Sequence, residues 1–355
     1  MKICWFGIYD RTYPRNDILI RGLKANNVEI IECQADWKDP SRYRILWKKL
    51  QVAEKDCDVI YAAYPSNLPV ILAKFLTRKP VVMDALYSMY DAVVNDRKEI
   101  PWFYPRAIKL WCDDWIAAML SDYMIVDTES HAAYWSRLPF VKRSKIRVVY
   151  TGVQDHIFYP SPAQTQNDIF LVSFHGLYIP LQGVDKIAET AYLLQKESGI
   201  KFRFIGSGQL SKKVDEVIKK HNLTNIEQTG RLPAPQVAKY SQEADVILGV
   251  FGNTEKTKRV IPNKIYEGMA LRKPVITMNT PSVREIFTEN DLLLIRNTPE
   301  ALAEAILRLK NDTVLREKLA SNGYEKVSKR YTPSVLGKIL LDYFNVFLKN
   351  NSKRT

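Results

Sequence analysis

The sequence contains little cysteine and little histidine, which argues against proteins that depend on disulfides or on bound zinc. Only four cysteines and four histidines occur among 355 residues. The cysteines, Cys4, Cys33, Cys57 and Cys112, form no CxxC pair. A disulfide scaffold and a zinc site are therefore not expected. Because Cys4, Cys33 and Cys57 lie in or beside apolar runs, we expect them to be reduced thiols in a core.

Long apolar runs are also missing, whereas positive charge is abundant. No run reaches the ~18 residues that a membrane-spanning helix needs, and residues 1–10 do not have the pattern of a signal peptide. We therefore expect a cytoplasmic protein. The formal net charge is +13, and basic residues gather at 38–55, 137–147 and 256–273. Such charge favours nucleic acid, an acidic membrane surface or a phosphorylated ligand as partner, although it can also simply solubilise the surface.

The length and the apolar pattern predict an α/β protein with two domains. A chain of 355 residues is longer than a single hydrophobic core usually accommodates. Short apolar runs alternate with amphipathic stretches, which is typical of parallel sheets covered on both faces. We predict two doubly wound, Rossmann-like domains. Their strands are expected at 3–7, 28–33, 58–62, 80–83, 123–127, 146–150, 170–174, 202–205, 226–229, 245–250, 274–277 and 292–295.

The predicted boundary is residues 151–167, which are polar, contain two prolines and show no periodicity. We expect one domain at 1–155 and the other at 168–330. A terminal helix at 331–355 is expected to pack back on the first domain.

The run at 260–276, VIPNKIYEGMALRKPVI, is the most informative stretch. It reads as a loop, a helix that begins after a proline, and a buried strand. A helix N-terminus with Lys264 suits a phosphate, and Glu267 could accept hydrogen bonds from sugar hydroxyls. Together these features indicate a nucleotide-sugar site. The alternative is an ordinary amphipathic helix with a solvated lysine and glutamate.

Other loops follow predicted strands, at the sheet edge where parallel α/β proteins bind ligands. They begin at Gly7, at Gly176 with Gly183 further on, and at Gly206 with Gly208. Residues 256–259 carry three cations, a candidate anion site or else a solvated loop. In the first half, Asp84 ends a strand and could act as an acid, base or hydroxyl ligand. His131 and His175 lie near such loops, but we assign neither a role in proton transfer.

Residues 101–120 are unusually aromatic, with Trp111 and Trp115 one helical turn apart. We expect this stripe, with Ile108, Ile116, Met119 and Leu120 nearby, to face the core. The alternative is a lipid interface, where tryptophan and basic residues occur together.

Taken together, these motifs resemble the GT-B glycosyltransferases, and most closely glycosyltransferase family 4. The resemblance covers nearly the whole chain, and its specific part is a C-terminal block. That block comprises Gly176 with Gly183, the GxG at 206–208, Gly230, the Ala-Asp-Val at 244–246 and the run at 267–276. The resemblance implies a donor site in the C-terminal domain, an acceptor site in the N-terminal domain and an interdomain cleft. It also implies transfer with retention and without a metal.

By this resemblance Glu267 binds the ribose of the donor, with the Gly268 and Met269 backbone close to it. Gly206 and Gly208 line the nucleotide pocket, and Arg231 lies near the base. The chain departs from the family at three places. Arg259 replaces the first of two glutamates, and Gln182 and Gly176 replace the lysine and arginine that hold the diphosphate. The N-terminal strand that often ends in histidine ends here near Asp84. Because a diphosphate still needs cations, we expect Lys258, Arg259 or Lys264 to replace them.

We predict a retaining glycosyltransferase of the hexosyltransferase type, acting in the synthesis of cell-surface polysaccharide or glycoconjugate. Its partners are a nucleotide sugar, a glycan or lipid-linked acceptor and, as an open alternative, an anionic membrane surface on the cytoplasmic side; nucleic acid is not expected. A nucleotide-sugar epimerase of GT-B fold and a basic nucleic-acid-binding protein are the alternatives. The predicted catalytic residues are Asp84, Arg259 and Lys264. The predicted donor-binding residues are Gly7, Gly176, Gln182, Gly183, Gly206, Gly208, Arg231, Lys258, Asn263, Glu267, Gly268 and Met269.

Overall fold

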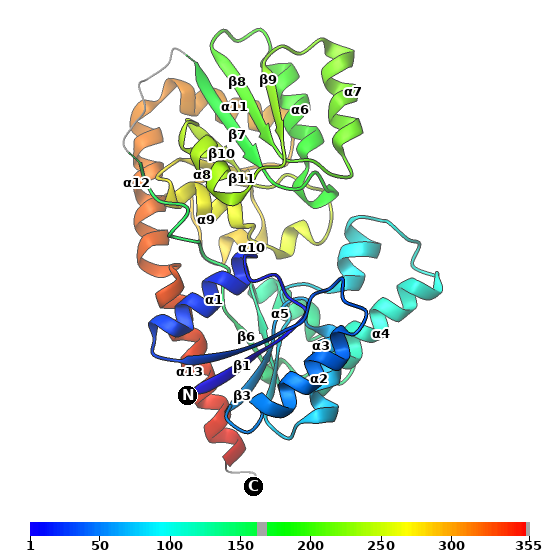
Figure 1. The fold of residues 1–355 in the computed structure, drawn as a ribbon. Helices are drawn as coiled ribbons and strands as arrows, with labels where there is room; N and C mark the ends of the chain where they lie inside the picture. Colours follow the sequence, from blue (N-terminus) through cyan, green and yellow to red (C-terminus); the bar gives the residue numbers. More distant parts are fainter. Residues whose placement is uncertain (162–168, 353–355) are drawn as a thin grey trace. The chain divides into compact units, whose positions relative to one another are not determined.

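The computed structural model describes residues 1–161 and 169–352 (Figure 1). Residues 162–167 of the predicted linker lie outside these described ranges. The chain divides into two compact units. Unit 1 is Met1–Gly152 with Thr332–Thr355, and unit 2 is Val153–Tyr331.

Within its described residues, unit 1 contains a six-stranded parallel sheet in the order β2-β1-β3-β4-β5-β6. Its strands are β1 (Lys2–Gly7), β2 (Glu29–Gln34), β3 (Val59–Ala62), β4 (Val81–Asp84), β5 (Tyr123–Val126) and β6 (Ile146–Val148). Its α-helices are α1 (Pro14–Ala25), α2 (Arg42–Ala53), α3 (Asn67–Leu76), α4 (Pro105–Leu120), α5 (Glu129–Trp135) and α13 (Pro333–Ser352). Every residue of β3 and β4 is buried, as expected of parallel strands with helices on both faces.

The described residues of unit 2 likewise contain a six-stranded parallel sheet, in the order β12-β11-β10-β7-β8-β9. Its strands are β7 (Phe170–His175), β8 (Ile200–Ile205), β9 (Ile226–Gly230), β10 (Val246–Leu248), β11 (Val275–Met278) and β12 (Leu293–Ile295). Its α-helices are α6 (Val184–Leu193), α7 (Ser211–His221), α8 (Ala234–Gln242), α9 (Asn263–Ala270), α10 (Pro281–Arg284), α11 (Pro299–Asn311) and α12 (Thr313–Arg330). Several helices begin where the sequence supplies a cap: Thr280 and Thr298 each accept a backbone hydrogen bond ahead of a proline.

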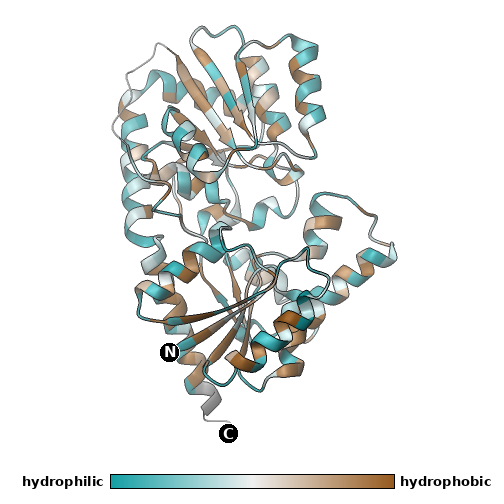
Figure 2. Ribbon diagram, in the orientation of Figure 1, coloured by the Kyte–Doolittle hydropathy of each residue, from teal (hydrophilic) through white to brown (hydrophobic). Residues whose placement is uncertain are grey.

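The predicted fold class is confirmed, since both sheets are parallel and doubly wound. Each predicted strand overlaps an observed one, and the central strands supply much of the apolar interior of each unit (Figure 2). Cys4, Cys33 and Cys57 are buried free thiols, as expected. Among the described residues, no helix is both long and apolar enough to cross a membrane.

The predicted core-facing stripe at 101–120 is wrong. In α4 the buried residues are Ala107, Asp114, Ala117 and Ala118, whereas Ile108 is 54% exposed. The periodicity of the bulky side chains identified the helix, but the small side chains are the ones that are buried.

Helix α13 completes unit 1 by packing on α1 and on the sheet. Phe347 stacks on Tyr123 of β5, with ring centroids 3.7 Å apart. The backbones of α1 and α13 touch at two glycines: a Cβ atom on Gly337 would lie 2.1 Å from the carbonyl carbon of Gly22. Glycine at both positions therefore sets the distance between the two helices.

We expect Gly337→Ala to destabilise unit 1 by about 2 kcal/mol because the added methyl group overlaps backbone atoms. In an unobstructed helix the same change would stabilise the protein by ~1 kcal/mol. The sign of the change in unfolding free energy therefore shows whether the two helix backbones are in contact. Urea unfolding followed by circular dichroism measures it. The control is Lys338→Ala, an exposed position of the same helix that pairs with Asp342, which should leave the transition almost unchanged. A Gly337→Ala midpoint at or above wild type would contradict the packing.

Candidate functional site

The sheet of unit 2 reverses its strand order at one point. Strands β7 and β10 are neighbours, and the chain leads from β7 to β8 on one side and from β10 to β11 on the other. Ligands of doubly wound folds bind beyond the carboxyl ends of the strands at such a switch point. The loops that leave β7 and β8 there begin at Gly176 and Gly206.

These two loops are in direct backbone contact, which requires glycine. Gly206 has φ +149°, and a Cβ atom on it would lie 1.9 Å from the carbonyl oxygen of Gly176. A Cβ atom on Gly208 would lie 2.8 Å from the carbonyl oxygen of Tyr178. The glycines therefore bring the loops together and leave backbone, rather than side chains, at the strand ends.

A pocket of about 280 Å³ opens at these strand ends. Its floor is formed by the β7 and β8 loops, and α8 and α9 contribute its sides. It is lined by Phe158, His175, Gly176, Leu177, Ile205, Gly206, Arg231, Leu232, Ala234, Val237 and Glu267. The lining is mostly apolar with few polar groups, which is the composition of a small-molecule site.

Glu267 supplies the carboxylate of this pocket, and His175 holds it in place. His175 Nε2 lies 2.7 Å from Glu267 Oε2, and Ser241 Oγ lies 3.4 Å from His175 Nδ1. In the neutral ring, Nε2 donates to the carboxylate while Nδ1 accepts from the serine hydroxyl. Glu267 is only 7% exposed, so this hydrogen bond fixes which oxygen remains available to a ligand.

Lys264, one helical turn before Glu267 on α9, places a buried amine beside the same pocket. Its side chain is 4% exposed, and Nζ donates to Gln182 Oε1 over 2.5 Å. Nζ also lies 3.9 Å from the centroid of the Phe174 ring, and 2.9 Å from where a Cβ atom on Gly176 would be. Any side chain at position 176 would therefore displace the amine.

Burial holds the pKa of Lys264 well below its ordinary range, although the charge of Glu267 acts in the opposite direction. An ammonium can donate three hydrogen bonds, and Gln182 accepts one of them. An anion that reached this amine would restore its charged form.

The structure brings together only some of the predicted residues. The pocket is lined by the predicted residues Gly176, Gly206, Arg231 and Glu267. Gln182 does not line it but accepts a hydrogen bond from Lys264 beside it. Arg231 is held at the rim by Ser207, with Nε and Oγ 3.0 Å apart.

Other predicted donor-binding residues of unit 2 do not line the pocket. Gly183, with φ +65°, brings the α6 loop against the backbone of Phe251. Gly268 lets α9 approach the sheet, because its Cβ atom would lie 3.0 Å from Ile247 and Val275. Met269 is fully buried and Asn263 is the first residue of α9. Contacts between these residues and a donor stay predictions.

The two remaining cations lie in the loop before α9. Lys258 is exposed and pairs with Glu255 over 2.6 Å, and Arg259 ends a short 3-10 turn at Thr257–Arg259. Neither lines the pocket.

Gly7 and Asp84 belong to unit 1. Asp84 is fully buried, and the Arg15 guanidinium donates to its carboxylate over 3.1 and 3.2 Å. The same guanidinium donates to the carbonyl oxygen of Val149 over 2.6 Å. Asp84 therefore joins α1 to the sheet in this structure, and its carboxylate does not face solvent.

Sequence reasoning missed the His175–Glu267 pair and the contribution of Phe158. His175 was visible at a strand end, but its partner lies 92 residues later. Phe158 stacks on His175, with ring centroids 6.5 Å apart, and the sequence indicated no role for it in a binding site. Within the described residues, no group of three or more His, Cys, Asp or Glu side chains is arranged to hold a metal ion.

Comparison with known proteins identifies this half of the chain. Residues 160–326 match the family model described as glycosyl transferases group 1. The chain contains a glycosyl transferase group 1 domain. That domain includes every residue that lines the pocket except Phe158.

Two curated relatives and one solved structure are similar to this chain. An uncharacterised glycosyltransferase of Methanocaldococcus jannaschii is 32% identical over 54% of this chain and 50% of its own length. The chain thus spans about half of that relative. The capsular polysaccharide biosynthesis glycosyltransferase CapM of Staphylococcus aureus is 22% identical over 79% of this chain and 74% of its own.

The structure of Anabaena HepE in complex with UDP and glucose superposes with a TM-score of 0.72 at 14% identity, over 98% of this chain and all of HepE. This likeness shows the fold, and the predicted GT-B fold of two Rossmann-like domains is confirmed. Membership of family 4 and retention stay predictions.

The buried amine of the group 1 domain should make its stability depend on pH. Because the folded-state pKa of Lys264 is depressed, the unfolded chain binds more protons, and stability rises with pH up to the ordinary lysine range. We expect Lys264→Met to raise stability at pH 7 by on the order of 1 kcal/mol, or about 2–4 °C in Tm. The gain should shrink as the pH approaches 10.

Thermal melts between pH 6 and 10 measure this effect, with the exposed Lys258→Met as the matched control. A Lys264→Met variant that melts below wild type at pH 7 would show that the amine stabilises the fold, contrary to this account.

Proposed function

We propose that this protein transfers a sugar from a nucleotide-sugar donor to a glycan or lipid-linked acceptor in the synthesis of cell-surface polysaccharide. The observation that carries the proposal is the pair of groups on one face of α9 at the strand ends: a carboxylate oriented by His175 and a buried amine one turn away. The relatives support the class, since one takes part in capsular polysaccharide biosynthesis and HepE was solved with UDP and glucose.

In this proposal Glu267 binds the ribose. A carboxylate accepts hydrogen bonds from two neighbouring hydroxyls, and the bond from His175 leaves its other oxygen available. The apolar side chains of Leu177, Leu232 and Val237 surround the base, and Arg231 lies at the rim. Such a pocket binds a nucleoside of matching shape without requiring charge on the base.

Lys264 binds the diphosphate, and it is preferred over Lys258 and Arg259 for two reasons. It is the cation that approaches Gly176 at the pocket floor, whereas the Lys258 ammonium is exposed and already paired with Glu255. It is also buried, where a charge-assisted hydrogen bond to phosphate is stronger than in water. Gln182, which replaces a family lysine in the sequence, positions this amine.

The reaction then depends on stabilising the leaving nucleoside diphosphate. As the bond between the anomeric carbon and the diphosphate oxygen breaks, negative charge grows on that oxygen, and Lys264 lies ready to stabilise it. We propose hexosyl transfer with retention and without a metal. Asp84 is left out of this catalysis, because its carboxylate is buried against Arg15.

Nucleotide binding by matched variants tests the two roles. UDP, GDP and their nucleosides are titrated against the protein, and a ligand at ~100 times its Kd should stabilise by about 2.7 kcal/mol. Lys264→Met should weaken the diphosphate at least about ten-fold and leave the nucleoside unaffected, because only the diphosphate meets the amine. Lys258→Met is the control, and equal losses for both variants would contradict the assignment.

Glu267→Gln should weaken nucleoside and nucleoside diphosphate alike by about ten-fold, because both contain the ribose. Isothermal titration calorimetry measures each affinity. If the loss appeared for the diphosphate alone, Glu267 would not be the ribose ligand.

The transfer itself is tested with the nucleotide sugar that stabilises the protein most. We expect release of nucleoside diphosphate that is accelerated by an acceptor, and a product with the anomeric configuration of the donor by NMR. Conversion of the donor into its epimer without release of the nucleotide would instead indicate the epimerase alternative.

A further inference from the structure

Helix α4 of unit 1 buries its small side chains and leaves its bulky ones half-buried or exposed. Ala107, Ala117 and Ala118 are fully buried, whereas Ile108 is 54% exposed and Met119 36%. A helix packed only for stability shows the opposite arrangement. The exposed apolar face therefore calls for a reason other than the core of unit 1.

The loop that leads into α4 extends this apolar face. Trp102 is 71% exposed, and Phe103 and Tyr104 are also exposed. The Phe103 ring lies 5.8 Å from those of Trp102 and Tyr104. Consecutive exposed aromatic residues that contact each other form a patch, unlike the scattered apolar residues of ordinary surfaces.

A second loop contributes Phe140, which is 80% exposed and has φ +62°. A phenylalanine at positive φ is strained. The loop is fixed to α4, because Trp115 Nε1 donates to the carbonyl oxygen of Pro139 over 2.9 Å. Trp115 in turn stacks on Trp111, with ring centroids 5.6 Å apart. We call these residues the α4 surface: Trp102, Phe103, Tyr104, Ile108, Trp111, Trp115, Met119 and Phe140.

The α4 surface is held rigidly from beneath by a buried carboxylate. Asp114 accepts hydrogen bonds from Ser88 Oγ and from the backbone N–H groups of Met89 and Tyr90, and it also contacts Asn67. Burial raises its pKa to about 6. These bonds join α4 to α3 and to the segment after β4, so the exposed rings lie on a fixed platform.

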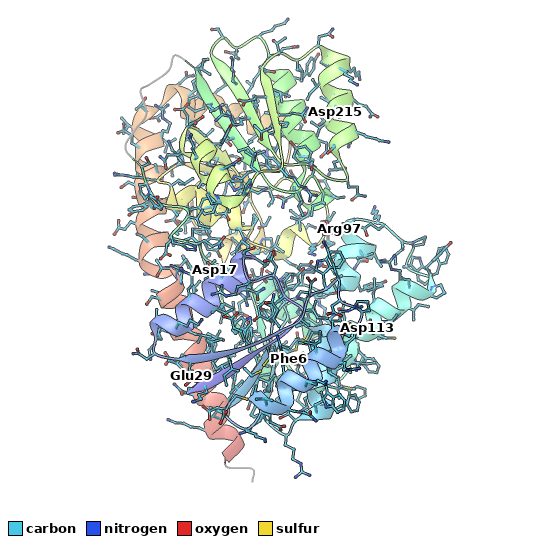
Figure 3. All side chains as sticks on the ribbon, in the orientation of Figure 1. Phe6, Asp17, Glu29, Arg97, Asp113 and Asp215 are labelled. Carbon is cyan, nitrogen blue, oxygen red and sulfur yellow. The ribbon has the colours of Figure 1, made fainter. Side chains whose placement is uncertain are left out.

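Cations flank the α4 surface. Arg106 and Lys109 lie on the first turns of α4, and Lys109 pairs with Asp113, which Figure 3 labels. The stretch at 137–147 around Phe140 contains arginine and lysine but no aspartate or glutamate, and its Arg137 and Lys142 are exposed. Such an arrangement suits a partner that is apolar at its centre and negative around it.

We propose that the α4 surface docks unit 1 on an anionic phospholipid bilayer. Tryptophan and tyrosine favour the boundary between lipid headgroups and acyl chains, and each nearby lysine or arginine adds attraction to a negative leaflet. A second copy of this chain fits less well, because the cations would then face one another. The proposal is independent of the sugar chemistry of unit 2.

Sedimentation with vesicles tests the docking. We expect the protein to bind vesicles of equimolar phosphatidylcholine and phosphatidylglycerol, to bind phosphatidylcholine alone weakly, and to be released by salt. The variant Trp102→Ser with Phe103→Ser should bind the anionic vesicles about ten-fold more weakly, because two aromatic rings no longer enter the interface. The control is Trp37→Ser, since Trp37 is 70% exposed in the loop after β2, at the opposite edge of the sheet.

Three results would overturn the proposal. One is a double variant that binds the anionic vesicles as tightly as the wild-type protein does. Another is a Trp37→Ser variant that loses as much vesicle affinity as the double variant. The third is a concentration-dependent dimer, seen by sedimentation equilibrium, that the double variant abolishes, because the α4 surface would then join two copies. Unchanged melting and unchanged UDP binding of the double variant show that it is folded. Vesicle binding by a wild-type protein that fails to bind any nucleotide would leave the docking intact and refute only the transferase.

Discussion

A lysine amine with almost no access to water, at the carboxyl end of the second sheet, constrains everything around it. Lys264 can lie where it does only because position 176 has no side chain and because Gln182 accepts its hydrogen bond. The same helix, α9, fixes Glu267 one turn later against His175. A buried amine costs stability unless it meets a negative charge. In the proposed function a phosphate-bearing ligand offsets that cost, and the nucleoside attached to it lies in the adjacent pocket of about 280 Å³.

The fold could be predicted from the sequence because strands and turns are marked by short, local sequence patterns. Each strand is a short apolar run between loops, and the GxG at 206–208 marked a place where backbones touch. The site was only partly predictable, because its decisive contacts join distant residues: His175 meets Glu267 across 92 positions and Lys264 meets Gln182 across 82. The sequence offered Lys258, Arg259 and Lys264 as equivalent cations. Burial and pairing distinguish Lys264 from Lys258, and neither can be read from a motif.

Two predictions in unit 1 were limited in the same way, because the decisive contacts join residues far apart in the sequence. The spacing of Trp111 and Trp115 indicated a helix but not which face lies inward. That choice depended on Asp114, whose carboxylate is satisfied by partners on α3 and after β4. Asp84 ends a strand, as a catalytic carboxylate often does, but its carboxylate forms a buried ion pair with Arg15 of α1. In both cases a buried carboxylate pairs with a group on another element, and for Asp114 this leaves the α4 surface on the outside of the helix.

The central claim is that the Lys264 amine receives the diphosphate of the donor. NMR titration of the lysine side chains, with the Lys264 resonance assigned by its loss in Lys264→Met, measures this directly. Without ligand, Lys264 should titrate below the other lysines, and saturating UDP should raise its pKa, because a phosphate stabilises the ammonium. Uridine should leave that pKa unchanged. A Lys264 resonance that titrates identically with and without bound UDP would contradict the account.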